Sequence, residues 1–241
     1  MKQFLVGLAS LVLITALVIS YFLFLDPARA RNRSMFVVQF IQNPQTHQDW
    51  VTPALSQCAG APFLFPTTGL IGYLWDDSFK AGHRHQGIDI FGGTAPGQTA
   101  VYAAYDGYLS RPSDWKSTII IRIASDPLHP STQVWTYYTH MADLNGNSFV
   151  SPQFQAGTSE EFVKAGTFLG FQGDYSGDPN NPVGVHLHFS IVRDDGSGHY
   201  TNELEIKNTL DPSLYLGYPL NAASNPDLPL TCTPVNNSNS Q

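Results

Sequence analysis

Two short stretches bring together side chains that could bind a metal ion. HRHQGIDIFGG contains His85 and Asp89, and VHLHFSIV contains His186 and His188. The whole chain has only eight histidines, so their concentration in two stretches is informative. In an extended strand, His186 and His188 would lie on one face and their apolar neighbours on the other. Two imidazoles would then stand side by side, about 6 to 7 Å apart.

The first stretch needs a bend before it can contribute two ligands. His85 and Asp89 share strand parity, but a fully extended strand would hold them about 13 Å apart, which is too far for one ion. Gly87 lies between them and offers that bend. Two histidines and one carboxylate around an open fourth position form a common catalytic zinc set, because a closed site leaves no place for a water nucleophile. One of the four candidates would then be available as a base. The alternatives are a polar surface loop and a pair of structural histidines.

The elements that hold these residues are predicted to be short β-strands. The chain has 20 glycines, 17 prolines and 12% aromatic residues but only 13% charged residues, which favours a loop-rich β protein over a helical bundle. The clearest strands are β-branched and aromatic runs at 99–110, 118–125, 133–141 and 184–192. Residues 164–177 are predicted to form another strand, with tight turns at Gly166 and Gly173. The connection at 143–161 has a length that is usually functional or mobile.

The N-terminus is predicted to be one transmembrane helix that anchors the chain. No charge occurs from Phe4 to Leu25, and at about 1.5 Å per residue this stretch spans the apolar core of a bilayer. The alternative is a signal peptide cleaved after the small-x-small motif Ala28-Arg29-Ala30. A short helix is predicted over 36–41. The chain is accordingly divided into an anchor (1–33), a membrane-proximal segment (34–60), a folded domain (61–216) and a C-terminal tail (217–241).

Charge and cysteines restrict the partners and the compartment. A formal net charge of -7 leaves no basic surface for nucleic acid, so no such partner is predicted. Cys58 and Cys232 lie near the two ends of the folded region and are predicted to form a disulfide, which suits an oxidising exterior. Two unrelated buried thiols are the alternative. The positive-inside rule predicts the opposite compartment, because Arg29, Arg31 and Arg33 would place the domain in the cytoplasm.

The ordered motifs resemble the lysostaphin-type (LytM-like) zinc endopeptidases, which cut peptidoglycan peptides. HQGID and HLHF look like the paired motifs of that family, and TAVYAAYDGYLS looks like the strand that follows the first motif. YYTHM matches the stretch that carries a third functional histidine, here His140, and VKAGTFLGFQGDYSG resembles the glycine-rich approach to the second motif. The resemblance covers about 62–216. The chain departs from the family in having Tyr-Thr-His-Met where Gly-His-Leu is common.

This resemblance implies a fold and a set of roles. The fold would be mainly β, with antiparallel sheets, the duplicated hybrid motif of the family and an open groove floored by a sheet. His85, Asp89 and His188 would bind one zinc ion, His186 would accept a proton from water, and His140 would stabilise the oxyanion. Three tyrosines are candidates for the groove walls: Tyr137, Tyr138 and Tyr175.

The predicted function is that of a zinc-dependent endopeptidase that hydrolyses peptidoglycan stem or cross-bridge peptides as a monomer. A wall enzyme must act outside the cytoplasmic membrane, so we expect a single-pass bacterial membrane protein whose domain, 61–216, is extracytoplasmic, despite the three arginines. Secretion after signal cleavage is the alternative.

Two other functions are consistent with the motifs. One is a catalytically inactive relative that binds the wall or activates another hydrolase, although such proteins usually lose a ligand or base, and all five positions are present here. The other is a zinc-containing structural or binding module. The remaining histidines are predicted to be surface residues: His47, His83, His129 and His199.

Overall fold

The structure is a computed structural model, and it describes residues 26–78 and 83–233 of the chain. Its first element is helix α2 (Asp26–Gln42), followed by the 3-10 helix η2 (Pro44–Trp50). The predicted anchor at 4–25 lies outside the described residues. Within the described ranges, no helix has the length and apolar character needed to cross a bilayer.

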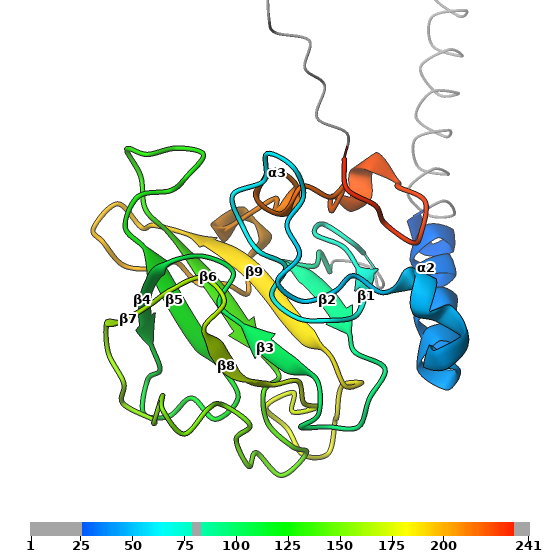
Figure 1. Ribbon diagram of the computed structural model, residues 1–241, viewed down its shortest axis with the longest axis horizontal. Helices are drawn as coiled ribbons and strands as arrows, with labels where there is room; N and C mark the ends of the chain where they lie inside the picture. Colours follow the sequence, from blue (N-terminus) through cyan, green and yellow to red (C-terminus); the bar gives the residue numbers. More distant parts are fainter. Residues whose placement is uncertain (1–25, 79–82, 234–241) are drawn as a thin grey trace, which may run out of the picture.

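Most of the described chain folds around one antiparallel sheet of eight strands (Figure 1). These are β1 (Leu70–Tyr73), β2 (Ile88–Phe91), β4 (Gly107–Ser110), β5 (Ile119–Ile123), β6 (Val134–Thr139), β7 (Glu161–Val163), β9 (Leu187–Arg193) and β10 (Thr209–Leu210). Their order is β1-β2-β9-β6-β5-β4-β7, and β10 pairs with β9. A separate two-stranded sheet contains β3 (Ala100–Tyr102) and β8 (Phe168–Phe171). The prediction of a mainly β, antiparallel fold is confirmed.

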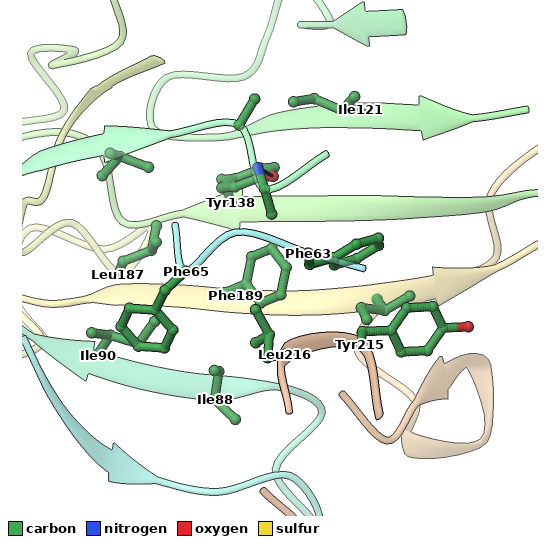
Figure 2. Packing of buried hydrophobic residues seen from close by; sticks show 14 of the residues in the cluster. Phe63, Phe65, Ile88, Ile90, Ile121, Tyr138, Leu187, Phe189, Tyr215 and Leu216 are labelled. Carbon is green, nitrogen blue, oxygen red and sulfur yellow. Dashed lines mark hydrogen bonds between the residues drawn. The ribbon is translucent and has the colours of Figure 1, made fainter. Parts of the chain in front are cut away.

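One face of the large sheet carries the hydrophobic core. In β9, Leu187, Phe189 and Ile191 are each 0% exposed, as the alternation of apolar and polar residues predicted. Figure 2 shows Leu187 and Phe189 packed with Ile88 and Ile90 from β2 and with residues that cover the sheet: Phe63, Phe65, Tyr215 and Leu216. The last two belong to the short helix α3 (Ser213–Leu216), and two 3-10 helices, η3 (Ile206–Asn208) and η4 (Ala222–Ser224), flank it in sequence. Each large apolar side chain buried here contributes about 1.5–3 kcal/mol, so this face holds the fold together.

The predicted strand at 99–110 is two strands in two different sheets, so that prediction was wrong in part. β3 pairs with β8, whereas β4 pairs with β5 and β7. Between them the chain turns away, and Ala103 donates a backbone hydrogen bond to Thr167 instead of continuing the ladder (2.9 Å). A continuous β-rich sequence therefore does not reveal where a strand changes sheets.

Helix α2 packs against the outer strand β1 on the face opposite the core (Figure 1). It includes the short helix that was predicted over 36–41. Val37 fits over Gly72, where a Cβ would lie only 2.4 Å from a methyl group of Val37. Arg33 forms a buried ion pair with Asp77, with the Arg33 Nη2 and Asp77 Oδ1 atoms 2.5 Å apart. The helix is thus joined to the sheet by apolar packing and by a paired charge.

The predicted disulfide between Cys58 and Cys232 is confirmed. The two Cα atoms are 5.6 Å apart, although 174 positions separate the residues in sequence. Cys58 also packs against Gly217, where a Cβ would lie 2.5 Å from the Cβ of Cys58. The bridge therefore fastens the C-terminal segment to the segment that precedes the sheet.

Candidate metal centre

Two of the three predicted ligands face each other across neighbouring strands. β2 and β9 are antiparallel partners, and Asp89 lies directly opposite His188 in their register. Both side chains project to the polar face, because Ile88, Phe189 and the other apolar neighbours point into the core. Strand pairing alone therefore brings a carboxylate beside an imidazole from a residue almost one hundred positions away.

His85 reaches the same point from outside the strand. β2 begins only at Ile88, and the backbone of His85 pairs with the segment before it, donating to Asp77 O and accepting from Asp76 N (both 2.8 Å). The chain bends at Gly87, as predicted, and the glycine has a second role. It lets the chain pass close to β9, because a Cβ there would lie 2.3 Å from the carbonyl oxygen of Phe189.

Three donor atoms converge at this point: His85 Nε2, Asp89 Oδ1 and His188 Nδ1. The distance from His85 Nε2 to Asp89 Oδ1 is 3.1 Å, that from His85 Nε2 to His188 Nδ1 is 3.0 Å, and that from His188 Nδ1 to Asp89 Oδ1 is 2.9 Å. Tetrahedral zinc with bonds of about 2.0 Å places its ligand atoms about 3.3 Å apart, so a small outward movement of the three atoms would accommodate the ion. All three residues are buried, and they form a candidate metal-binding group.

The outer nitrogens of both histidines are held so that the inner ones can bind a metal. His85 Nδ1 donates to the carbonyl oxygen of Leu74 (2.9 Å), which leaves a lone pair on Nε2. His188 Nε2 donates to Glu203 Oε1 (2.9 Å), which leaves Nδ1 facing the group. When His188 Nδ1 carries no proton, two imidazole lone pairs and a carboxylate oxygen point at one another, an arrangement that a cation stabilises. The donor set fits zinc.

Glu203 is a functional candidate that the sequence did not indicate. It lies in the loop after β9, which is held near the first motif because Gln86 Nε2 donates to the carbonyl oxygen of Leu204 (2.8 Å). Glu203 Oε1 also accepts a hydrogen bond from Ser190 Oγ (3.0 Å). Burial raises the pKa of Glu203, but the charge and hydrogen bond of His188 and the hydroxyl of Ser190 outweigh it and lower that pKa. Glu203 is therefore a carboxylate at neutral pH.

The site favours positive charge even without a metal. Burial raises the pKa of Asp89, but the charges of His85 and His186, with hydrogen bonds from His186 and His188, outweigh it and hold that pKa well below its usual value. Burial lowers the pKa of His188, but Glu203 and Asp89 outweigh it and raise that pKa to about 10. In the metal-free site, a proton on His188 therefore supplies positive charge where a metal ion would otherwise supply it.

His186 and His140 stand beside the ligand group, and the Nδ1 atom of each is held by a backbone carbonyl oxygen. His186 Nδ1 donates to the carbonyl oxygen of Gly184 (2.5 Å), and its Nε2 lies 3.5 Å from Asp89 Oδ1. His140 Nδ1 donates to the carbonyl oxygen of Tyr175 (2.7 Å), and the centroid of its ring lies 4.6 Å from that of His186. Burial, together with the neighbouring histidines, lowers the pKa of His140 to about 3, so this ring is neutral at pH 7.

One of the three tyrosines proposed as groove walls was placed wrongly. Tyr138 points into the core, where it is fully buried and its hydroxyl oxygen accepts a hydrogen bond from Ala104 N (2.9 Å). Strand alternation leaves Tyr137 on the opposite face, in contact with Trp115. The backbone carbonyl oxygen of Tyr175 accepts the hydrogen bond from His140, and its side-chain hydroxyl donates to Gly177 O (3.3 Å).

The other histidines take no part in the ligand group. His129 and His199 are exposed, as predicted, whereas His47 is half-buried and stacks on Trp50 with the ring centroids 3.7 Å apart. His83 is also half-buried, so the prediction of four surface histidines holds for only two of them.

An antiparallel β fold with a buried His-Asp-His group is consistent with a metal-dependent endopeptidase. The structure is similar to those of M23-type peptidases. It aligns with the catalytic domain of the antimicrobial peptidase lysostaphin from Staphylococcus simulans at 19% identity and a TM-score of 0.38, covering 60% of this chain and 87% of that one. It aligns with the catalytic domain of the prophage-encoded M23 protein EnpA from Enterococcus faecalis (a mutant form) at 20% identity and a TM-score of 0.35, covering 62% of this chain and 95% of that one.

A third similar structure is that of Csd3 from Helicobacter pylori, at 20% identity and a TM-score of 0.36. That alignment covers 60% of this chain but only 34% of Csd3, so the chain spans about a third of that protein. No family model matches the chain, and no curated protein matches its sequence.

Proposed function

We propose that the chain is a zinc-dependent endopeptidase that hydrolyses peptide bonds in the stem or cross-bridge peptides of peptidoglycan. The observation that carries this proposal is the convergence of three buried donor atoms, each about 3 Å from the other two, with two further histidines beside them. A metal that only stabilised a fold would not need a second pair of oriented imidazoles. The polar face of an antiparallel sheet also suits an extended peptide substrate.

The proposed roles follow from which atoms are already engaged. His85 Nε2, Asp89 Oδ1 and His188 Nδ1 would hold the metal. When bound at such a site, zinc acts as a Lewis acid and lowers the pKa of a water molecule towards neutrality. His186 would accept the proton of the attacking water at Nε2, since its Nδ1 is held by Gly184 O.

His140 would act on the other side of the reacting carbonyl group. Its Nδ1 is held by Tyr175 O, so Nε2 is the atom that would face the substrate and border the developing oxyanion. The proton that His186 takes from water would be the one that it gives to the departing amine, which returns His186 to its starting state. His186 would therefore move the proton, and His140 would border the reacting carbonyl group on the other side.

The placement of the enzyme is part of the proposal. We propose that residues 4–25 anchor a monomer in the cytoplasmic membrane and that the domain lies on the extracytoplasmic side. The disulfide supports this location, because such bonds persist in oxidising compartments.

The experiment is to incubate the purified, zinc-loaded chain with cross-linked muropeptides from several wall types and to detect new amine termini by mass spectrometry. We expect cleavage that stops when a zinc chelator is added and resumes when zinc is restored. The matched control is His186→Ala, which should bind zinc without cleaving. If the zinc-loaded chain releases no new termini from any wall type, the hypothesis of an inactive wall-binding protein or activator replaces this one.

A further inference from the structure

A hollow of about 370 Å³ lies directly beside the ligand group, on the side of β1. Its lining comes from α2 (Val37 and Ile41), β1 (Tyr73), β2 (Asp89 and Phe91) and the segment that leads into β9 (Val183, Gly184 and His186). Asp89 belongs to the ligand group and His186 stands next to it, so the hollow opens onto the place where a substrate carbonyl would lie. A peptide bound at the metal would carry a neighbouring side chain into this space.

The helix that forms the outer wall is fixed in place. The buried pair of Arg33 and Asp77 joins α2 to the segment after β1. Tyr73 donates a hydrogen bond to Ser34 Oγ on the helix (2.9 Å). Val37 packs over Gly72, as described above. The wall is therefore part of the folded domain, although the helix precedes the stretch that resembles the zinc endopeptidases.

The chemistry of the lining selects the kind of side chain that would occupy the hollow. None of the described residues that line it is a lysine or an arginine, so an acidic side chain would be buried without a partner. The carboxylate of Asp89 already contacts three histidines. The rest of the surface is aliphatic or aromatic, and Phe91 stacks against His186 with the ring centroids 5.0 Å apart. A volume of this size lies at the small end of ligand pockets, which hold about 300–1,000 Å³.

We propose that this hollow is a specificity subsite that takes an aliphatic side chain of the residue next to the bond that is cut. The inference rests on the proposed endopeptidase function and adds to it a preference that α2 creates. Glycine at that position would leave the hollow empty. Leucine would bury part of its side chain against Val37, Ile41 and Phe91.

The test uses the full-length, zinc-loaded chain in detergent and two peptides that cannot be cleaved because the scissile amide is replaced by a methyleneamine. They differ only in having leucine or glycine at the neighbouring residue, and calorimetry measures their affinities. Each methylene group removed from water is worth about fourfold in affinity, so partial burial of leucine predicts a preference of about tenfold or more. Ile41→Asp should reduce this preference to near onefold, because it places a charge in the wall.

Val38→Asp is the matched control, because Val38 lies on the same helix, is 50% exposed against 45% for Ile41, and does not line the hollow. It should keep the full preference for leucine. Equal affinities for the two peptides, no detectable binding of the leucine peptide, or the same loss in both variants would overturn the subsite. Thermal unfolding of both variants shows whether either change disturbs the fold.

Cleavage of the corresponding normal peptides separates this inference from the proposed function. If neither peptide is cleaved while the leucine preference and its loss in Ile41→Asp persist, the endopeptidase proposal fails and the subsite stands. If both peptides are cleaved but bind equally, the subsite alone is refuted.

Discussion

Glu203 provides the sharpest test of how the metal centre is built. Its carboxylate accepts the Nε2 proton of His188 at 2.9 Å and so leaves Nδ1 as the atom that could bind a metal. Glu203→Gln keeps an acceptor of the same shape but removes the charge, and Glu203→Leu removes both. Outer partners of metal-bound histidines are typically worth about 10- to 100-fold in metal affinity. Because Glu203 is largely buried and its charge is close to His188, we expect about tenfold weaker zinc binding for Gln and about 100-fold for Leu, or about 1.4 and 2.7 kcal/mol.

The assay is competition for zinc against a fluorescent chelator at constant pH. The matched control is Glu205→Gln, two positions further along the same loop, where the exposed side chain pairs with Lys207 instead of a ligand. Circular dichroism and urea unfolding of the metal-free proteins separate a loss of affinity from a loss of fold. Zinc affinity that is unchanged in Glu203→Leu would refute the reasoning, because the orientation of His188 would then not depend on this carboxylate.

Four further predictions concern the site and the frame around it. Asp89→Ala should lower the zinc content, measured by elemental analysis, far below one ion per chain while the core keeps its fold; full occupancy would remove Asp89 from the ligand set. His186→Ala and His140→Ala should keep zinc but lose about 10²-fold or more in turnover, and a variant that loses its zinc would have to be counted among the ligands. The pKa of His140 is about 3 in the folded protein against about 6.5 in an unfolded chain, so its contribution to stability is present above pH 6.5 and is lost as the pH falls towards 3. Urea unfolding should show this decline, and the decline should be smaller in His140→Gln; an identical pH profile would contradict it. Cys58→Ser should lower the free energy of unfolding by about 2–4 kcal/mol, and an unchanged urea midpoint would show that the bridge adds no stability.

The candidate metal-binding group could be predicted because it depends on local spacing and on strand alternation. Leu187, Phe189 and Ile191 determine which face of β9 is buried, and His188 then has to lie on the other face. The same rule does not settle Tyr138, because β6 has large apolar or aromatic residues at both parities: Val134 and Tyr138 on one, Trp135 and Tyr137 on the other. The wrong prediction for that tyrosine came from choosing residues by type alone.

Other features depend on tertiary contacts that no local pattern encodes. Glu203 lies in an irregular loop and reaches His188 only because the loop folds back onto the first motif. Helix α2 was expected to be a short membrane-proximal element, and nothing in its sequence indicates that Val37 would meet Gly72. The position at which the run 99–110 changes sheets is likewise set by the partners of each half, β8 and β5.

The disulfide has a consequence for the resistance of the protein to cleavage in surroundings that contain proteases. The bond between Cys58 and Cys232 closes a covalent ring, and every residue of the metal centre lies within that ring. A single cut in any loop of the ring would open it without releasing a fragment, because both pieces would still be joined at the other end. Two cuts would be needed to separate part of the centre from the rest. A nicked molecule could therefore keep its ligands in register, held by the sheet and by one sulfur–sulfur bond.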